Sequence, residues 1–357
     1  MIARAFRTVA ACALAGVVVA SCGDDAKGKE RVRIPKGSSF RAAAESLAAH
    51  GLVANARVFG LYAKLRGRDR SLRYGTYVLA RGSSWNALLA DLRSGKGIVH
   101  AVTIPEGWTL QRMIPVLAEA VEIPRESLFA AVRDSALRER LDVPTPTLEG
   151  YLFPDSYEFG DNATARDVVA TMVARFEQVW QDEWTERAKA MALTRHDLVT
   201  LASIVEGEVR RREEGPVVAA VYLNRLRARM PLQADPTVNY ALKRFPGRVL
   251  YKDLKVKSAY NTYVNPGLPP GPIGAPGAAS LEAAAHPADV PYKFFVAHPD
   301  GHHEFRTTYR EHLAAIRMVR ATAAGLREER AMQAALDSAA RAAGAPLDSV
   351  RRRPRGR

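Results

Sequence analysis

Residues 194–209 read TRHDLVTLASIVEGEV, and this stretch predicts a helix that carries the densest set of candidate functional residues in the chain. Thr194 is followed three residues later by Asp197, a spacing that resembles the capping box at a helix start. At about 100° per residue the predicted helix has one apolar face, made of Leu198, Leu201, Ala202, Val205 and Val209. The stretch therefore indicates an amphipathic helix packed against a core.

Glu206 lies on the shoulder of this face, roughly 60° beyond Val209. A carboxyl group in that position is partly desolvated, which raises its pKa and suits a residue that first donates and then accepts a proton. The alternative is an ion pair with Arg210 four residues on, which would lower the pKa. From the pattern alone the ion pair is the commoner arrangement. Glu208 lies about 160° away around the helix, so we expect no same-face dyad of carboxylates.

The length and composition of the chain indicate two or three packed domains. Of 357 residues, 47% are hydrophobic and 25% charged, which excludes disordered and collagen-like classes. The only long apolar run lies at the N-terminus, so a polytopic membrane protein is also excluded. The excess of 52 basic over 38 acidic residues gives a net charge of +14, which favours a polyanionic partner.

The N-terminus has the pattern of an export signal. Residues 1–7 carry two arginines, residues 8–20 are uncharged, and Val19, Ala20 and Ser21 precede Cys22. This ending resembles a lipobox with Cys22 as the lipidated residue; an uncleaved single-pass anchor is the alternative. Either places the body outside the cytoplasmic membrane, which argues against nucleic acid as a partner. Because both cysteines fall within residues 1–22, the body can hold no disulfide, Cys–zinc site or thiol nucleophile.

The rest of the chain divides by pattern. We expect an anchoring segment over residues 1–22, a tether over 23–31, a strand–helix–helix–strand module over 32–100, a helix-rich domain over 101–318 and a basic, solvated tail over 319–357. The fold class is α+β.

Three turns, at residues 34–39, 79–84 and 104–109, each predict a helix capped by Ser or Thr. Residues 167–184 predict one long amphipathic helix, and residues 292–308 a hairpin.

Candidate polar sites other than Glu206 are weaker. Amide, hydroxyl and aromatic side chains suited to sugar recognition occur in residues 230–238, 258–263 and the Pro/Gly tract 266–277. Taken singly, each of these side chains is also ordinary in a loop. His298, His302 and His303 fall in the predicted hairpin without a helical His–Glu pattern, so no metal site is predicted. No Gly-x-Ser-x-Gly elbow of a serine hydrolase is present.

Six stretches in order resemble the endolytic murein transglycosylases, the MltG or YceG-like family. They are residues 148–157 (LEGYLFPDSY), 201–208 (LASIVEGE), 232–238 (LQADPTV), 259–263 (AYNTY), 267–273 (GLPPGPI) and 284–287 (AAHP). The resemblance covers about residues 32–318. The sequence departs from the family pattern at Gly207, a residue that weakens helices, and at Cys22, because the family more usually has a transmembrane anchor.

The resemblance implies a membrane-attached enzyme with a LysM-like module followed by a mixed α/β catalytic domain, without a cofactor. Such enzymes cut glycan strands internally between N-acetylmuramic acid and N-acetylglucosamine without water, leaving 1,6-anhydro ends. The catalytic glutamate of the family matches Glu206. The implied partners are peptidoglycan glycan strands, the cytoplasmic membrane and glycan polymerases such as penicillin-binding proteins.

Five further residues are expected to contact the glycan. The candidates for holding acetamido groups and orienting the sugar ring are Gln233, Asn261 and Tyr260. The candidates for lining the same groove are Tyr151 and Glu149. Two other functions remain open at this point: a hydrolytic muramidase acting on the same substrate, and a non-catalytic murein-binding scaffold for cell-wall synthases.

Overall fold

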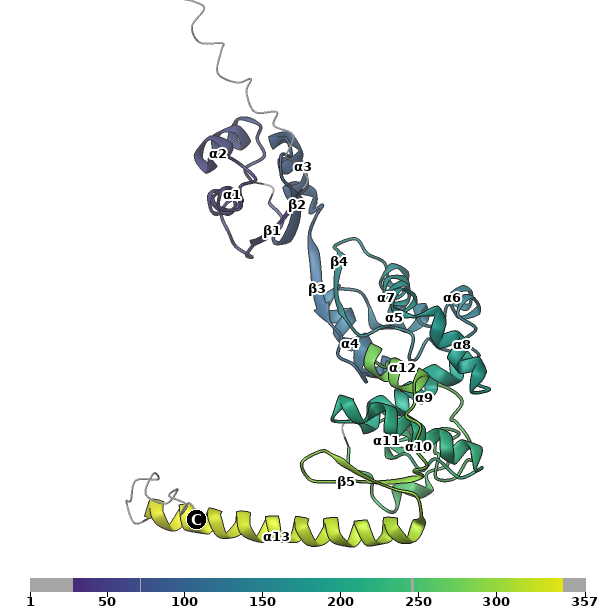
Figure 1. Ribbon diagram of the computed structural model, residues 1–357. Coiled ribbons are helices and arrows are strands. Elements are labelled where there is room, and N and C mark those ends of the chain that lie inside the picture. The colour runs from purple at the N-terminus through teal and green to yellow at the C-terminus, as the bar shows by residue number, and fades with distance from the viewer. Residues whose placement is uncertain (1–27, 71, 245–246, 343–357) are drawn as a thin grey trace, which may run out of the picture. The chain divides into compact units, whose positions relative to one another are not determined.

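The computed structural model describes residues 28–70, 72–244 and 247–342, which form two compact units (Figure 1). The first unit comprises the described residues up to Ala101 together with Glu158–Ala163. The second comprises Val102–Tyr157 and the described residues from Thr164 onward. Cys22 and the predicted anchor and most of the tether lie outside the described residues. The mixture of helices with small sheets agrees with the expected α+β class.

The first unit has the predicted strand–helix–helix–strand order. Its elements are β1 (Lys29–Ile34), α1 (Phe40–Ala49), α2 (Ala56–Leu65), β2 (Gly75–Ala80) and α3 (Trp85–Ser94). β1 and β2 pair antiparallel, with Lys29 opposite Ala80 and Ile34 opposite Gly75. The side chains of Ser39 and Ser84 accept hydrogen bonds from backbone amides at the starts of α1 and α3, which confirms two of the three predicted caps.

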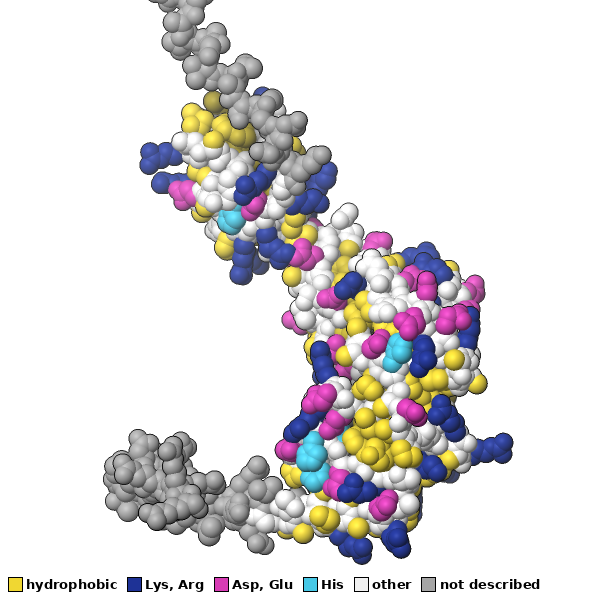
Figure 2. Space-filling view, viewed as in Figure 1, with side chains coloured by type: hydrophobic (Ala, Val, Ile, Leu, Met, Phe, Trp, Pro, Cys, Tyr) yellow, Lys and Arg dark blue, Asp and Glu magenta, His cyan; other side chains and the backbone are white. Residues whose placement is uncertain are grey.

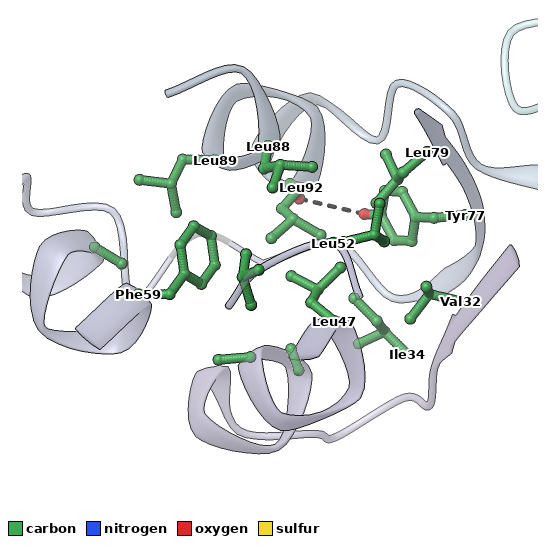
Figure 3. Packing of buried hydrophobic residues seen from close by; sticks show 14 of the residues in the cluster. Val32, Ile34, Leu47, Leu52, Phe59, Tyr77, Leu79, Leu88, Leu89 and Leu92 are labelled. Atoms are coloured by element: carbon green, nitrogen blue, oxygen red, sulfur yellow. Dashed lines mark hydrogen bonds between the residues drawn. The ribbon is translucent and has the colours of Figure 1, made fainter. Parts of the chain in front are cut away.

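The apolar faces of these elements close around one core (Figure 3). Leu47 and Phe59 from α1 and α2 meet Leu88 and Leu92 from α3, and all four side chains are buried. Tyr77 is also buried, and its hydroxyl donates to the carbonyl of Leu92 at 3.3 Å, so its one polar atom is satisfied within the core.

The second unit is mainly helical. Its helices are α4 (Leu110–Ala120), α5 (Arg125–Ala131), α6 (Ser135–Arg140), α7 (Ala165–Val179), α8 (Asp182–Ala190), α9 (Arg195–Glu208), α10 (Gly215–Arg227), α11 (Asp235–Ala241), α12 (Ala278–Ala285) and α13 (Tyr309–Ala342), with short 3₁₀ turns η1 (Arg212–Glu214) and η2 (Asp253–Lys255). The strands β5 (Phe294–Ala297) and β6 (His303–Arg306) form the predicted hairpin. The strands β3 (Val99–Thr103) and β4 (Ser156–Gly160) pair with each other and contribute residues to both units.

The prediction of one helix over residues 167–184 was wrong. α7 ends at Val179, Trp180 adopts an extended backbone, and α8 begins at Asp182. At this break Trp180 packs edge-on against Trp184 with ring centroids 5.6 Å apart, and Arg195 lies over its ring at 4.5 Å. Arg195 lies outside residues 167–184, so helical periodicity could not reveal its contact with Trp180.

α9 begins as predicted and is buried more completely than predicted. The Thr194 side chain accepts from the Asp197 amide, and the Asp197 side chain accepts from the Thr194 amide, which completes the capping box. Residues on every side are buried, including Val199, Thr200 and Ile204, so α9 is a central helix with no solvent face along most of its length.

The predicted boundary at residue 318 falls inside α13, which continues to Ala342. Residues 319–342 of the predicted basic tail are therefore helical. Among the helices of residues 28–70, 72–244 and 247–342, none combines the length and the apolar character needed to cross a bilayer.

The positive charge of the chain is concentrated at its N-terminal side. Residues 29–101 hold 14 basic and 4 acidic residues, a net charge of +10, whereas residues 102–318 hold 26 basic and 28 acidic residues, a net charge of −2. On the face shown in Figure 2, basic and acidic side chains are interspersed over the second unit. Basic and acidic residues are therefore nearly balanced over residues 102–318.

Arg225 ties α10 to two segments that surround the candidate site. Its Nη1 donates to the Leu232 carbonyl at 2.6 Å and its Nε to the Lys293 carbonyl at 2.6 Å, while only 7% of the residue is exposed. Removing a buried guanidinium that donates hydrogen bonds to two carbonyls lowers the free energy of unfolding strongly, because both carbonyls then lose their partners.

We expect Arg225→Met to lower the free energy of unfolding of the second unit by about 2–4 kcal/mol, because two buried carbonyls become unpaired. The measurement is urea denaturation followed by tryptophan fluorescence, since Trp108, Trp180 and Trp184 all lie in this unit. The exposed Arg227→Met, on the same helix, is the control and should change stability by less than about 0.5 kcal/mol. Equal effects of the two substitutions would contradict this role of Arg225.

Candidate active site

Glu206 lies in the last turn of α9, where the otherwise buried helix reaches the surface. It is partly exposed, whereas the five residues before it are buried. The neighbouring Gly207 does not interrupt the helix. A Cβ atom at position 207 would lie 2.8 Å from Cβ of Pro236, so glycine here permits the close approach of α11.

The carboxyl group of Glu206 is held at the start of α12. The Ser280 hydroxyl donates to Oε2 at 2.7 Å, and the Gly277 amide donates to the same oxygen at 3.1 Å. No hydrogen bond to Oε1 occurs within the described ranges. One oxygen is thus fixed by the N-terminal turn of a helix, where negative charge is favoured, while the other remains available to a substrate.

The ion pair between Glu206 and Arg210 is not formed. α9 ends at Glu208, so Arg210 lies beyond the helix and not one turn further along it. Burial raises the pKa of Glu206 above its ordinary value, against the lowering effects of the hydrogen bonds from Ser280 and Gly277. The first of the two sequence interpretations, a partly desolvated carboxyl with a raised pKa, is the one that the structure supports.

Two charged residues face Glu206 and act on its pKa in opposite directions. The Glu106 carboxylate raises this pKa and the Arg212 guanidinium lowers it, and the two pair with each other through a hydrogen bond of 2.7 Å. Glu106 comes from the turn before α4. That turn is fixed because the Gly107 amide donates to the Ala275 carbonyl at 2.8 Å, and the Ala275 amide to the Trp108 carbonyl at 2.9 Å.

Gly277 fits closely into this arrangement. A methyl group at position 277 would overlap the carboxylate of Glu106, so the absence of a side chain lets Glu106 and the amide that binds Glu206 come together. The α9 end, the α12 start and the turn at 106–108 therefore form one site.

Glu208 serves a different part of the structure. It accepts a hydrogen bond from the Tyr222 hydroxyl at 2.9 Å, and burial raises its pKa to about 7. Its hydrogen-bond partners are different from those of Glu206, in agreement with the expectation that the two do not form a dyad.

Glu149 and Tyr260, two of the predicted glycan contacts, are connected through Tyr240. The Glu149 carboxyl accepts from the Leu110 amide at 2.9 Å and from the Tyr240 hydroxyl at 3.2 Å, and burial raises its pKa to about 7. The rings of Tyr240 and Tyr260 lie 4.7 Å apart. Gln233 is exposed, with its backbone in the left-handed region at φ 50° and its amide bonded to the Thr262 carbonyl at 3.1 Å.

Two of the predicted glycan contacts, Tyr151 and Asn261, are fully buried in the structure. The Tyr151 ring is fully buried and its hydroxyl bonds to His196 Nδ1 at 2.9 Å. The buried Asn261 side chain donates to the carbonyls of Leu254 and Val256 at 3.0 and 2.9 Å. The polar atoms of both side chains form hydrogen bonds within the protein, to His196 and to the backbone of the 254–256 segment.

Four residues near the site, Glu106, Arg212, Ser280 and Tyr240, are not predicted by the sequence patterns. Glu106 lies within a turn whose pattern indicates only a helix cap, and Ser280 lies 74 residues from Glu206 beyond an aperiodic Pro/Gly tract. Tyr240 follows the 232–238 stretch and could have been found as one of the tyrosines beside it.

The histidines of the hairpin pair with acidic side chains one by one. His298 bonds to Glu304 at 3.0 Å and His303 to Glu214 at 2.6 Å. In the part of the chain that the structure describes, no group of three or more His, Cys, Asp or Glu side chains could hold a metal ion.

Comparison with known proteins agrees with the sequence resemblance. The model of the YceG-like family matches residues 32–318. A Bacillus subtilis (strain 168) protein named endolytic murein transglycosylase is 34% identical over 304 residues, which cover 81% of this chain and 84% of that protein.

Two further relatives extend the comparison. A Streptococcus pneumoniae (strain D39) protein of the same name is 29% identical over 306 residues, and the match spans only 55% of that longer protein. The crystal structure of a yceG-like protein from Listeria monocytogenes has a TM-score of 0.56 at 30% identity, covering 81% of this chain and 99% of that one.

We expect Glu106→Gln to lower the pKa of Glu206 and Arg212→Gln to raise it, because the first removes a repelling charge and the second an attracting one. The measurement is a carbon-13 NMR titration of the Glu206 carboxyl, assigned by its loss in Glu206→Gln. The exposed Glu213→Gln is the control and should leave the pKa unchanged. Shifts of the same sign in the Glu106 and Arg212 variants would contradict this arrangement of charges.

Proposed function

The chain belongs to the YceG-like family, and we propose that it is an endolytic murein transglycosylase in which Glu206 is the catalytic acid and base. The observation that carries this proposal is the position of Glu206 at the exposed end of a buried helix, with Oε2 held by Ser280 and Gly277. The relatives that bear the name of this activity support it.

The reaction needs one carboxyl group that works twice. Protonated Glu206 gives its proton to the glycosidic oxygen between N-acetylmuramic acid and N-acetylglucosamine as the bond from C1 to that oxygen breaks. The O6 hydroxyl of the same muramic acid forms a bond to C1 and passes its proton to the Glu206 carboxylate. The proton balance closes, the 1,6-anhydro ring forms, and no water is consumed, since the nucleophile belongs to the reacting sugar.

The surroundings of Glu206 suit both steps. Burial raises the pKa of Glu206, which favours the protonated form that the first step needs. After proton transfer, the new carboxylate faces the Ser280 hydroxyl, the Gly277 amide and the positive end of α12, which stabilise its charge without rearrangement.

A hydrolytic muramidase would need a second carboxylate to activate water or to attack the sugar. Glu106 is an acidic residue whose charge acts on Glu206, and its carboxylate is paired with Arg212 at 2.7 Å. This pairing favours the one-carboxyl reaction. A non-catalytic scaffold would have no use for an isolated carboxyl with a raised pKa at the surface.

Gln233 and Tyr260 are our candidates for glycan contacts, whereas Glu149, whose oxygens are engaged by Leu110 and Tyr240, is a candidate only for lining the groove. Gln233 offers an exposed amide on a fixed backbone, and Tyr260 a half-buried ring beside Tyr240. Tyr151 and Asn261 support the neighbouring loops. The LysM-like character of residues 32–100 and the association with penicillin-binding proteins stay predictions.

We also propose attachment to the cytoplasmic membrane through residues 1–22, with the catalytic part on the outer side. The support is the sequence pattern alone: two arginines, an uncharged run and a lipobox-like ending at Cys22.

We expect the soluble chain 23–357 to release muropeptides from purified murein with anhydro ends, lighter by one water than hydrolysis products. Glu206→Gln should lower the rate by about 10³-fold, because it cannot donate a proton. The wild-type rate should fall as pH rises through the raised pKa of Glu206. Mass spectrometry of the products is the measurement, with Glu213→Gln as the unaffected control. Hydrated ends would identify a muramidase, and full activity of Glu206→Gln would exclude the proposed role.

We expect the full chain expressed in a bacterium to occur in the membrane fraction and Cys22→Ala to leave that fraction, because a lipid on Cys22 supplies the anchoring free energy. Cell fractionation with immunoblotting measures this, and Cys12→Ala, which keeps the lipobox-like ending, is the control. If Cys22→Ala stays with the membrane, the uncleaved apolar segment is the anchor and lipidation is refuted.

A further inference from the structure

A cavity of about 280 Å³ lies in the second unit beside Glu149 and is not lined by Glu206. Its lining residues come from the start of α4, the end of α5, the 147–149 segment and α11; they are Thr109, Leu110, Gln111, Phe129, Val132, Arg133, Thr147, Glu149, Tyr240 and Lys243. The volume is many times that of one water molecule, so the cavity can hold part of an organic ligand.

We propose that this cavity binds the anionic peptide stem carried by the muramic acid residues of the glycan strand, an inference that rests on the proposed function. The stem is a short chain of amides, small apolar side chains and free carboxylates. The cavity offers a matching set of groups: an apolar wall, an unused hydroxyl and two basic side chains.

The hydroxyl belongs to Thr109, which is 1% exposed and has no hydrogen-bond partner. Thr109 occupies the cap position of α4, where the sequence predicts that its side chain binds the first helical amides. The Glu149 carboxyl takes the Leu110 amide instead. A buried polar atom left without a partner costs free energy, so a ligand that accepts or donates a hydrogen bond at Thr109 recovers this cost.

The charge of the cavity is positive at its lining residues Arg133 and Lys243. Both are exposed. The Arg133 guanidinium donates one hydrogen bond to the Phe129 carbonyl at 3.0 Å, and Lys243 forms no ion pair within the described ranges. The helix end fixes its position, because the Lys243 amide donates to the Tyr240 carbonyl at 3.0 Å and the Arg244 amide to the Asn239 carbonyl at 2.9 Å. Since residues 102–318 have a net charge of −2, this pair of cations is a local feature and not part of a basic surface.

Glu149 is compatible with a ligand carboxylate. Both of its oxygens are already engaged, by the Leu110 amide and the Tyr240 hydroxyl. Burial raises its pKa to about 7, so at neutral pH a large fraction of the group is uncharged and does not repel an anion.

Two walls of the cavity lead directly to Glu206. Thr109 follows the turn that contains Gly107. A Cβ atom added at Gly107 would lie 3.5 Å from Cγ of Glu206, so this turn packs against Glu206. Tyr240 lies one helical turn after Pro236, which packs against Gly207. A glycan strand with its reacting sugar at Glu206 can thus place a substituent of that sugar, or of a neighbouring one, in the cavity.

The test measures binding and not cleavage. The chain 23–357 carrying Glu206→Gln is titrated with soluble glycan fragments that keep their peptide stems and with the same fragments after removal of the stems by an amidase. We expect Lys243→Glu, added to Glu206→Gln, to weaken binding of the stem-bearing fragments about tenfold and to leave binding of the stripped fragments within about twofold. Lys255→Glu, an exposed lysine outside the cavity, is the matched control and should change neither affinity.

Thr109→Val tests the cavity from inside. It keeps the shape of the side chain, and the hydroxyl it removes has no partner in the protein, so the free energy of unfolding should not fall. Binding of stem-bearing fragments should weaken about threefold or more, while that of stripped fragments should not change.

Equal losses for both kinds of fragment, or no loss in either variant, would refute the peptide-stem site. This readout does not depend on which residue catalyses the reaction. Full activity of Glu206→Gln would overturn the proposed role of Glu206, whereas a lost stem preference in Lys243→Glu would still support the cavity.

Discussion

The packing of α12 against α9 is the contact on which the site depends. Small side chains on α12 make it possible, because Ala283, Ala284 and Ala285 are all buried. Gly215 at the start of α10 lies beside them, with a Cβ position 3.1 Å from Ala283. Because the helices approach closely, the start of α12 can present the Gly277 amide and the Ser280 hydroxyl to Glu206 near the end of α9. A larger side chain in this interface would move the hydrogen-bond donors away from the carboxyl group. Glu206 would then lose the two hydrogen bonds that stabilise its carboxylate while burial raises its pKa.

The local features of the site were predictable from sequence, whereas its long-range contacts were not. The Thr194–Asp197 capping box placed α9 correctly, and the 100° periodicity placed Glu206 at the edge of its apolar face. The same periodicity suggested Arg210 as a partner, because nothing in the local pattern shows that α9 ends at Glu208. Ser280 could not be found, since the Pro/Gly tract between it and the preceding helix has no period to follow.

Polar residues in loops were the least predictable. Asn261 and Tyr151 are amide and hydroxyl side chains in irregular segments, and such residues usually lie at the surface. Here they are buried and bonded to backbone or to His196, because the loops around Glu206 have few regular hydrogen bonds of their own. Thr109 shows the opposite case: the sequence predicts a capping hydroxyl, and the structure gives that task to Glu149 from another segment. For Tyr151 and Thr109 the deciding contact comes from a residue distant in the sequence, whereas Asn261 bonds to carbonyls five and seven residues away.

The charge distribution separates two tasks along the chain. The net charge of +10 over residues 29–101 suits long-range attraction to an anionic wall or membrane, which depends on total charge and falls with salt. The net charge of −2 over residues 102–318 leaves the second unit free to use single charges at defined places. Glu106 and Arg212 illustrate this use. Their opposite charges nearly cancel as a pair, whereas Glu106 alone would raise the pKa of Glu206 and Arg212 alone would lower it. A site that must hold a proton and then take it back requires such a balance, because a large net field of either sign would favour one protonation state throughout the reaction.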